Sequence, residues 1–439
     1  MRIGTNSGRV GVGIATAALV ASAVPGAVAA QDPVAVCELA YYTGEFGAYG
    51  ESLSNDVIVP VENVINSDPP MGRPWELYHE DLGTNGEAQA YRACVDQHGA
   101  EVVISISHEY RTYRDAYLEQ VADNDSPVGP SVHGGSIPGN LGGNAAEPIF
   151  RAQGADEALG HGAVLQAEDF GAGNAVIFAT EVEGFQLAAN GAEAGAPAVG
   201  IELLARIDVP PEQPSYRAEA QRIADLDPDA VIVQAGSVES ATLIKQAQEA
   251  GYSGHWIGET GWIQNEFIDT LGTEPIAANE SVGYAAFGPD TESPAWAFYS
   301  DMWSNSTDTE KFGGAEDQYH FSTYDLMVQT ALAAEQAQSY KASEWVPAMR
   351  DVGSAPGEVC YTYADCLALI RDGMEIDYEG VTGPGEYTEG GMNTIRSAYV
   401  QFNEDGSTAD PVIFDTDRLL ALYPSLTQAE CDDSNVCDW

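Results

Sequence analysis

The sequence predicts an α/β protein whose parallel sheets are covered by helices on both faces. Short apolar runs of strand length alternate with segments whose apolar residues recur at helical spacing. The alternation occurs in two blocks, and polar segments rich in Gly and Pro separate them, notably residues 134–148. With 439 residues, 44% of them hydrophobic, the chain is long enough for two or three domains.

Each block is expected to run strand, helix, strand, helix, strand. The first helix contains Pro60, which should kink it. In chain order, the segments are 34–42, 50–66, 74–81, 86–99 and 100–107 in the first block, and 174–180, 216–228, 229–236, 239–251 and 255–260 in the second.

The first thirty residues are typical of an export signal. Arg2 and Arg9 precede an apolar stretch that ends in small residues, which predicts cleavage between Ala29 and Gln31. No cysteine lies at the cleavage point, so we expect no lipid anchor. No later apolar run reaches about 18 residues, so the mature chain is not expected to span a membrane.

The chain is strongly acidic, with 17 Lys and Arg against 68 Asp and Glu and a formal net charge of −51. Without the export signal the balance is 15 against 68, or −53. A polyanion repels nucleic acids and anionic lipid surfaces, so we exclude both as partners. The acids are scattered along the chain. This favours a halophile-like surface, solvated and suited to high external salt, over a site for one cationic partner.

Six cysteines on an exported chain favour disulfide bonds. Two pairs, 360 with 366 and 431 with 437, would each close a short loop, which leaves 37 with 94 by elimination. Other pairings remain formally possible. A metal site is the alternative, but no C-x-x-C spacing occurs. The candidate residues are Cys37, Cys94, Cys360, Cys366, Cys431 and Cys437.

The loops after the expected strands share small residues, hydroxyls, aromatic rings and a few carboxylates. In open parallel sheets, ligands bind beyond the carboxyl ends of the strands. Convergent polar groups on an apolar wall suit a small-molecule pocket. The sequence contains no G-x-S-x-G elbow, no H-E-x-x-H and no P-loop, so we expect neither an enzyme nor a cofactor.

Three segments carry a family resemblance. Residues 41–66, "YYTGEFGAYGESLSNDVIVPVENVIN", combine a strand end, a glycine- and aromatic-rich loop and a helix. The others are "IFRAQGADEALG" (149–160) and "YEGVTGPGEYTEGGMNTIRSAYVQFNEDG" (378–406). In order and spacing they resemble the type I periplasmic solute-binding proteins of ABC transporters, most nearly the branched-chain amino acid (Leu/Ile/Val) branch. The resemblance covers roughly residues 33–415.

The resemblance implies two doubly wound α/β lobes joined by three crossings of the chain, which close on a ligand about a hinge. The crossings are expected near 154–157, 283–287 and 377–398. The implied division is a signal at 1–30, a first lobe of 31–155 plus 286–380, a second lobe with hinge crossings of 156–285 plus 381–415, and a disulfide-looped tail of 416–439.

The resemblance also implies where an amino acid would bind. Its carboxylate would meet Ser107 and the backbone N–H groups at helix starts, with Val132 and His133 in a second carboxylate-facing loop. Tyr49 matches the aromatic residue that covers the ligand side chain, and Glu259 matches the acid that binds the amine. A structural role is the alternative for each residue, such as a helix N-cap for Ser107.

Two loops depart from the family pattern. Glu183 stands where an aromatic residue is usual, and Ser237 and Glu239 follow a glycine where aromatic residues are common. We therefore expect a less aromatic and more acidic pocket that suits a polar or cationic ligand. The alternative is that both acids belong to the acidic surface. Trp262 is expected to form a pocket wall or part of the core.

Together these observations predict the substrate-binding component of an ABC importer. Such a protein is expected to be a monomer in the periplasm that binds an amino-acid-like solute and delivers it to a permease in the inner membrane. The alternative is a sensory protein that presents an amino acid or amide to a receptor or regulator. The sequence does not identify the ligand.

Overall fold

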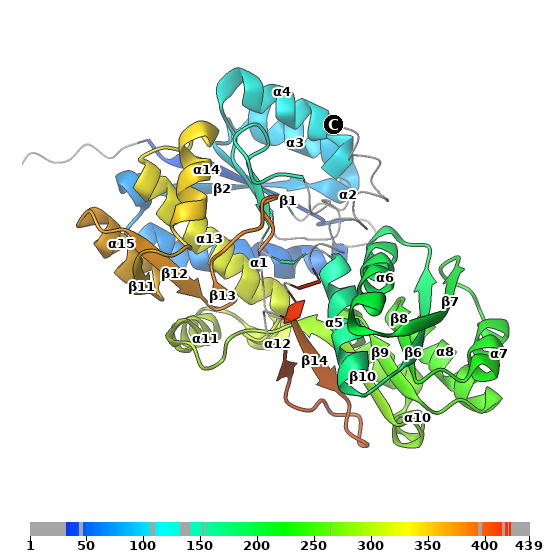
Figure 1. Ribbon diagram of the computed structural model, residues 1–439. Helices are drawn as coiled ribbons and strands as arrows, with labels where there is room; N and C mark the ends of the chain where they lie inside the picture. Colours follow the sequence, from blue (N-terminus) through cyan, green and yellow to red (C-terminus); the bar gives the residue numbers. More distant parts are fainter. Residues whose placement is uncertain are drawn as a thin grey trace, which may run out of the picture.

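The computed structural model describes residues 32–43, 47–105, 110–131, 141–151, 153–154, 156–263, 265–393, 397–414, 418–419 and 421–422. Over these residues the chain forms two α/β lobes, each built on a mainly parallel sheet packed against helices (Figure 1). The fold class predicted from the sequence is confirmed. None of the helices formed by these residues is long and apolar enough to cross a membrane.

The first lobe contains a parallel five-stranded sheet in the order β2-β1-β3-β4-β5 and a small sheet in the order β11-β12-β13. Its strands are β1 (Val34–Ala40), β2 (Trp75–Asp81), β3 (Val102–Ser105), β4 (Gly129–Ser131), β5 (Ile149–Arg151), β11 (Glu358–Cys360), β12 (Ile376–Gly380) and β13 (Gly383–Pro384). Its helices are α1 (Gly47–Asn63), α2 (Leu82–Asn85), α3 (Glu87–Asp96), α4 (Arg114–Asn124), α11 (Pro294–Ser306), α12 (Thr309–Phe312), α13 (Gln318–Ala337), α14 (Ala342–Asp351) and α15 (Tyr363–Arg371).

The second lobe contains a seven-stranded sheet in the order β15-β14-β10-β9-β8-β6-β7, in which β14 and β15 run antiparallel to their neighbours. Its strands are β6 (Asn174–Thr180), β7 (Glu202–Val209), β8 (Ala230–Gln234), β9 (His255–Gly258), β10 (Ser281–Phe287), β14 (Ser397–Gln401) and β15 (Val412–Ile413). Its helices are α5 (Asp156–Asp169), α6 (Glu183–Gly195), α7 (Arg217–Leu226), α8 (Ser237–Ala250), α9 (Asn265–Leu271) and α10 (Thr273–Ala278).

The central strands of the second lobe, such as β6, β8 and β10, are buried on both faces. In β6, Val176 and Phe178 belong to one apolar core, and Ile177 and Ala179 belong to the other. Two-sided burial is typical of parallel sheets between helix layers. It explains why these strands read as continuous apolar runs in the sequence.

Helices α5 and α6 approach each other at glycines. A Cβ atom at Gly160 would lie 1.9 Å from the carbonyl oxygen of Ala188, and one at Gly191 would lie 2.1 Å from that of Glu157. Both distances are far below any van der Waals contact, so only glycine fits at these two positions. The two helices therefore pack backbone against backbone.

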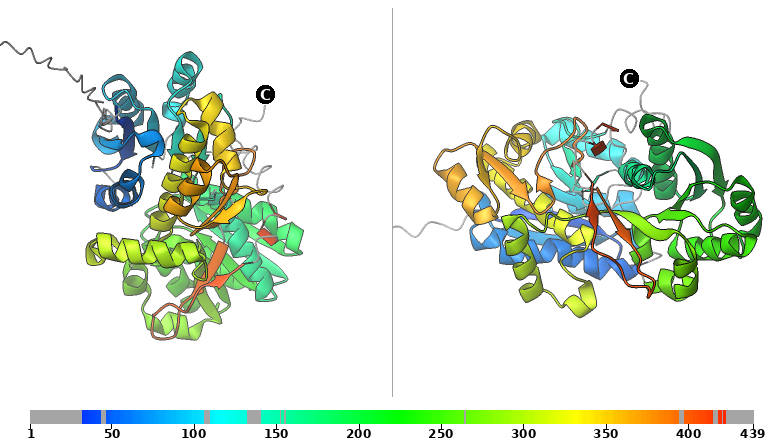
Figure 2. Two further views of the ribbon diagram at one scale, coloured as in Figure 1. Left: turned by 90° about the vertical axis from the view of Figure 1, so that its left-hand side faces the viewer. Right: turned by 60° about the horizontal axis from the view of Figure 1, so that its bottom comes forward.

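The two lobes lie side by side, and the chain passes between them three times (Figures 1 and 2). The passages lie between β5 and α5, between β10 and α11, and between β13 and β14. The lobe boundaries drawn from the sequence at 155, 285 and 380 remain predictions.

A buried carboxylate fixes the first-lobe segment that leads into the third passage. Asp325 of α13 is 1% exposed. It accepts hydrogen bonds from Tyr378 Oη (2.7 Å), the Val381 backbone N (3.1 Å) and the Thr382 backbone N (2.6 Å). Burial raises the pKa of Asp325, and these hydrogen bonds oppose that rise by stabilising the charged form.

Arginines extend this attachment along the passage. Arg350 of α14 donates to the carbonyl oxygens of Thr388 (3.0 Å), Glu389 (2.7 Å) and Gly143 (2.7 Å). The backbone of Arg151, at the end of β5, exchanges hydrogen bonds with residues 391 and 393. The chain is therefore held to the first lobe from Tyr378 through β13 and along the third passage to residue 393.

A buried ion pair joins α1 to α13. His320 Nδ1 lies 2.6 Å from Asp56 Oδ1, and both side chains are at most 2% exposed. Burial alone would lower the pKa of His320, but the facing carboxylate of Asp56 overrides it and raises the pKa to about 9. The imidazole therefore carries a positive charge at neutral pH.

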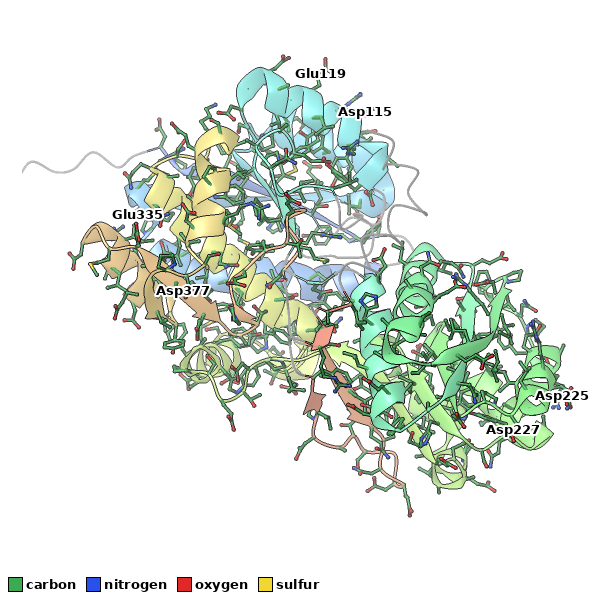
Figure 3. The ribbon with its side chains drawn as sticks, viewed as in Figure 1. Asp115, Glu119, Asp225, Asp227, Glu335 and Asp377 are labelled. Atoms are coloured by element: carbon green, nitrogen blue, oxygen red, sulfur yellow. A yellow bond between two sulfur atoms is a disulfide. The ribbon has the colours of Figure 1, made fainter. Side chains whose placement is uncertain are left out.

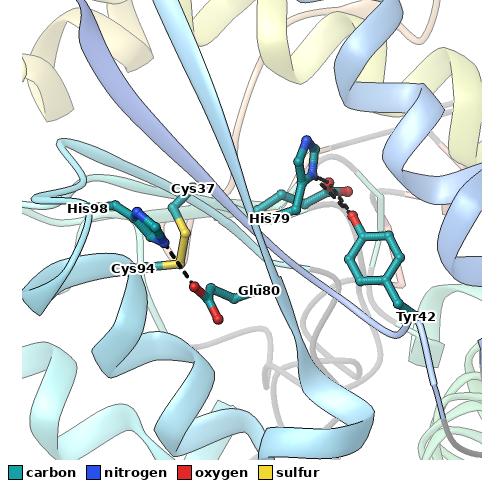
Figure 4. The surroundings of a disulfide bond; sticks show 7 residues. Cys37, Tyr42, His79, Glu80, Cys94 and His98 are labelled. Carbon is teal, nitrogen blue, oxygen red and sulfur yellow. Dashed lines mark hydrogen bonds and ion pairs between the residues drawn. A yellow bond between two sulfur atoms is a disulfide. The ribbon is translucent and has the colours of Figure 1, made fainter.

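Two of the three expected disulfides are present. Cys37 of β1 pairs with Cys94 of α3 (Figure 4), and Cys360 pairs with Cys366, with Cα–Cα distances of 5.6 and 5.4 Å. Both bonds were expected from the sequence, and the bond between Cys37 and Cys94 is the one that was reached by elimination. The disulfides exclude a metal-binding role for these four residues. Cys431 and Cys437 lie outside the described residues.

Acidic side chains occur on both lobes. Asp115 and Glu119 project from α4 of the first lobe, and Asp225 and Asp227 lie at the end of α7 in the second (Figure 3). All four are exposed. This spread matches the scattered acids of the sequence, and a surface suited to high salt stays a prediction.

Replacing Asp325 with Ala should destabilise the protein strongly. The substitution leaves a buried hydroxyl and two buried N–H groups without an acceptor, which we expect to lower the free energy of unfolding by about 3–5 kcal/mol. Urea denaturation measures this loss. Asp115→Asn, on the exposed face of α4, is the control and should change stability by less than about 0.5 kcal/mol. Equal midpoints for the two variants would contradict the role given to Asp325.

The His320–Asp56 pair should stabilise the protein less as the pH rises. The folded pKa of His320, about 9, lies above its ordinary value of 6.5, so the stability that its proton contributes is lost as the pH rises from 6.5 through 9. Burial also raises the pKa of Asp56, to about 7, so deprotonation of this carboxyl lowers stability in the same direction as the pH rises. Melting temperatures of the wild type and His320→Gln should therefore differ most at about pH 6 and converge near about pH 10. A difference that stays constant over this range would reject the charged pair.

Candidate functional site

Loops at the carboxyl end of the second-lobe sheet meet a first-lobe helix at one point. Glu259 directly follows β9, Asp156 is the first residue of α5, and Tyr319 lies in the first turn of α13. The charges of Asp156 and Glu259 both act on the Tyr319 phenol. We call these three residues the interlobe site.

Glu259 is half-buried, and its backbone neighbours hold its carboxylate in place. Its Oε2 accepts a hydrogen bond from the Gly261 backbone N at 2.7 Å. Burial raises the pKa of Glu259 to about 7; the hydrogen bond opposes this rise and the charge of Asp156 adds to it. Because its pKa lies near 7, the Glu259 side chain can gain or lose its proton within the physiological pH range.

Asp156 lies where two helices begin. It starts α5, and a Cβ atom at Gly184, in the first turn of α6, would lie 2.9 Å from its Oδ2. Helix N-termini carry a partial positive charge that stabilises a nearby carboxylate. The glycine leaves room for the Asp156 side chain beside α6.

Tyr319 brings a first-lobe hydroxyl to these two carboxylates. Asp317 caps α13 and accepts a hydrogen bond from the Tyr319 backbone N at 2.9 Å, which fixes the first turn of the helix. Burial raises the pKa of the Tyr319 phenol, and the charges of Asp156, Asp317 and Glu259 raise it further. The phenol therefore stays neutral and remains a hydrogen-bond donor and acceptor.

The chemistry of the interlobe site favours a cation. Two carboxylates close together repel each other, and a positively charged group between them relieves that repulsion. An ammonium group has three N–H donors, which suit two carboxylates and a phenol oxygen. In the part of the chain that the structure describes, no cluster of three or more His, Cys, Asp or Glu side chains could hold a metal ion.

Ser237 and Trp262 support the loop that carries Glu259. Ser237 Oγ donates to the Gly261 carbonyl oxygen at 2.8 Å, which ties the start of α8 to the short helix η5 (Thr260–Ile263). Trp262 is fully buried and stacks on Phe267, with ring centroids 4.3 Å apart. Of the two roles expected for Trp262, the structure therefore favours the core.

Glu239 has a structural task. Its carboxylate accepts hydrogen bonds from the backbone N of Gly236 (3.0 Å) and of Glu212 (2.5 Å), and the first of these links the third residue of α8 back to the N-cap backbone, which is one half of a capping box. This residue is therefore committed to local structure. This structural role accounts for the acid at position 239, where the family pattern has aromatic residues.

The remaining expected site residues are not tested. Tyr49 and Glu183 lie at the starts of α1 and α6, where the structure describes only their backbone. Ser107, Val132 and His133 lie outside the described residues. Their roles in binding stay predictions.

Sequence reasoning missed Asp156 and Tyr319. Asp156 lies within the quoted segment 149–160, and an acid at a helix start was the available signal. Tyr319 has no comparable signal, because its importance comes from contact with the other lobe.

The profile of the periplasmic binding protein family matches residues 33–362. No curated protein sequence matches the chain. Solved structures do match the chain, but their sequence identities are so low that they show only a shared fold.

Three of these structures illustrate the likeness. A leucine-binding protein, LivK, from Thermotoga maritima shares 16% identity over 88% of this chain and 99% of its own, with a TM-score of 0.65. A branched-chain amino acid transporter substrate-binding protein, LivJ, from Streptococcus pneumoniae, in complex with isoleucine, shares 15% over 87% and 99%, with a TM-score of 0.63. A solute-binding protein of an ABC transporter from R. palustris, in complex with benzoate, shares 14% over 88% and 98%, with a TM-score of 0.60.

Replacing Glu259 with Gln should weaken the binding of a ligand ammonium group by about tenfold to a hundredfold, because a charged hydrogen bond is lost. The pKa of Glu259, about 7, means that wild-type affinity should fall as the pH drops below 7 and the carboxylate is protonated. In the variant the affinity should be almost independent of pH over this range. Titration calorimetry at several pH values measures both effects.

Glu239→Gln is the matched control. It changes a nearby acid that caps α8, and a glutamine can still accept the capping hydrogen bond. If both variants bind equally tightly, Glu259 does not contact the ligand.

Proposed function

Because this chain belongs to the periplasmic binding protein family, we propose that it is the substrate-binding component of an ABC importer for an amino-acid-like solute. The family is one of binding proteins, so the interlobe site is assigned binding and no catalysis. The sensory alternative gains no support from the comparisons.

The electrostatic influence of two second-lobe carboxylates on a first-lobe phenol is the observation that carries this proposal. Tyr319 belongs to the first lobe, and Asp156 and Glu259 belong to the second. A ligand bound to all three would interact with both lobes at once. Such a ligand stabilises the arrangement in which the lobes approach each other, which is the differential contact that closure requires.

The charge of the site supports a ligand with an ammonium group. Two second-lobe carboxylates act on one first-lobe phenol, and a positively charged group bound beside them would lower their mutual repulsion. The carboxylate of an amino acid is proposed to meet the loops that contain Ser107, Val132 and His133. Related structures hold isoleucine and benzoate, so members of this fold differ in their ligands.

The proposed setting follows from the export signal expected at 1–30 and from the family. We propose that the mature chain acts as a monomer in the periplasm and delivers its solute to an inner-membrane permease.

Calorimetric titration with aliphatic, polar and cationic amino acids and with amides tests this function. At least one amino acid should bind. For the best one, its deaminated and decarboxylated analogues should each bind at least about tenfold more weakly, because each loses a charged interaction. A folded protein that binds none of these compounds would contradict the proposal, and equal affinity for the deaminated analogue would contradict the ammonium site.

A further inference from the structure

Gln234 is the last residue of β8, and its side chain is fully buried at the carboxyl end of the second-lobe sheet. β8 pairs in parallel with β9, and Ile232 lies opposite Ile257. The same register, continued by two residues, places Gln234 opposite Glu259, which directly follows β9. Neighbouring strands lie about 4.8 Å apart. Gln234 is therefore the neighbour, on the next strand, of an acid of the interlobe site.

The side chains of Gln234 and Glu259 are expected on the same face of the sheet. Successive residues of a strand point to opposite faces, so residues two positions apart share a face. Ile232 and Ile257 belong to an apolar core that also contains residues of α5 and α6, the helices beside β8 and β9 in Figure 1. Gln234 and Glu259 follow these isoleucines by two positions. They therefore lie toward α5, whose first residue, Asp156, acts electrostatically on Glu259.

The side-chain amide of Gln234 has no hydrogen-bond partner among the residues that the structure describes. Its Nε2 and its Oε1 are both buried, and neither bonds to another group in that part of the chain. Most buried polar side chains in proteins are bonded, because an unmade hydrogen bond in the interior costs free energy. An apolar side chain of the same size, such as leucine, would avoid this cost. The amide at position 234 is explained if a ligand supplies its partners.

The chemistry of an amide limits which ligand group can pair with Gln234. Nε2 donates hydrogen bonds and Oε1 accepts them. A ligand carboxylate could not donate to Oε1 and would add a negative charge beside Glu259, and an ammonium group could not accept from Nε2. A carboxamide satisfies both atoms at once, because its oxygen accepts from Nε2 and its nitrogen donates to Oε1. The amide of Gln234 therefore favours a ligand that carries a carboxamide.

We propose that Gln234 determines the specificity of the interlobe site and selects an amino acid with a carboxamide side chain, asparagine or glutamine. This inference rests on the proposed function, since it requires that an amino acid binds between the lobes. The ligand enters while the lobes are apart, its ammonium group meets Glu259, and its carboxamide pairs with Gln234 through two hydrogen bonds. In asparagine and glutamine these two groups are only a few bonds apart, which suits side chains on neighbouring strands.

Pairs of ligands with the same shape test this selection in the full mature chain. Leucine has nearly the shape of asparagine without its amide, and homoleucine stands in the same relation to glutamine. In calorimetric titration the wild type should bind asparagine or glutamine at least about tenfold more tightly than the apolar counterpart, and Gln234→Leu should remove this preference. If a ligand without a carboxamide binds best to the wild type, the inference is overturned while the proposed function stands. If no amino acid binds, both are overturned.

Stability without ligand gives a second readout. Gln234→Leu should raise the urea midpoint of unfolding, because it removes a buried amide that the protein itself does not bond. A lower midpoint would show that the amide serves the fold, and would overturn the inference.

Thr180→Val is the matched control. Thr180 ends β6, is fully buried, and its hydroxyl likewise has no partner within the described segments. It shares a face with Phe178, whose core lies on the opposite side of the sheet from that of Ile232. Thr180→Val should therefore raise the midpoint too but leave the ligand preference unchanged. An equal loss of preference in this variant and in Gln234→Leu would overturn the role given to Gln234.

Discussion

The buried carboxylate of Asp325 is the interaction that fixes the segment from which the chain leaves the first lobe for the last time. Asp325 holds the end of β12 and the turn that follows it, and it belongs to α13, whose first turn contains Tyr319. Tyr319 and Asp325 are about 9 Å apart along the helix axis at 1.5 Å per residue. His320 fastens the same helix to α1 through Asp56. One rigid helix thus carries both the anchor of the connecting segment and the first-lobe part of the site.

The chain satisfies its buried acids with few cations. Glu38 and Asp325 are bound by hydroxyl, backbone N–H and imidazole donors, without lysine or arginine. Glu147 is bound by the Tyr110 hydroxyl at 2.6 Å as well as by Arg114. A chain with 17 cationic and 68 acidic side chains must do this, because a buried carboxylate without donors is costly. The tyrosines, 21 in number, supply part of this capacity.

The fold could be predicted from the sequence because two-sided burial imposes continuous apolar runs on the strands, as in β6. The site could be predicted only in part. The family resemblance pointed to Glu259, since that residue follows a strand end in an expected loop. It could not point to Tyr319, whose neighbours belong to the other lobe and to distant segments of the chain. Trp262 stayed ambiguous because an aromatic residue at a strand end suits a core as well as a pocket wall.

The absence of a side chain at Gly184 determines where the Asp156 carboxylate can lie, and therefore affects the electrostatics of the interlobe site. A methyl group at this position would lie 2.9 Å from Asp156 Oδ2 and would crowd the carboxylate beside the start of α6. The acid would have to turn away, and its distance from Glu259 and Tyr319 would change although no charged residue had been replaced. This glycine can therefore act as a tuning position for ligand charge, and relatives could diverge in what they bind through an uncharged substitution.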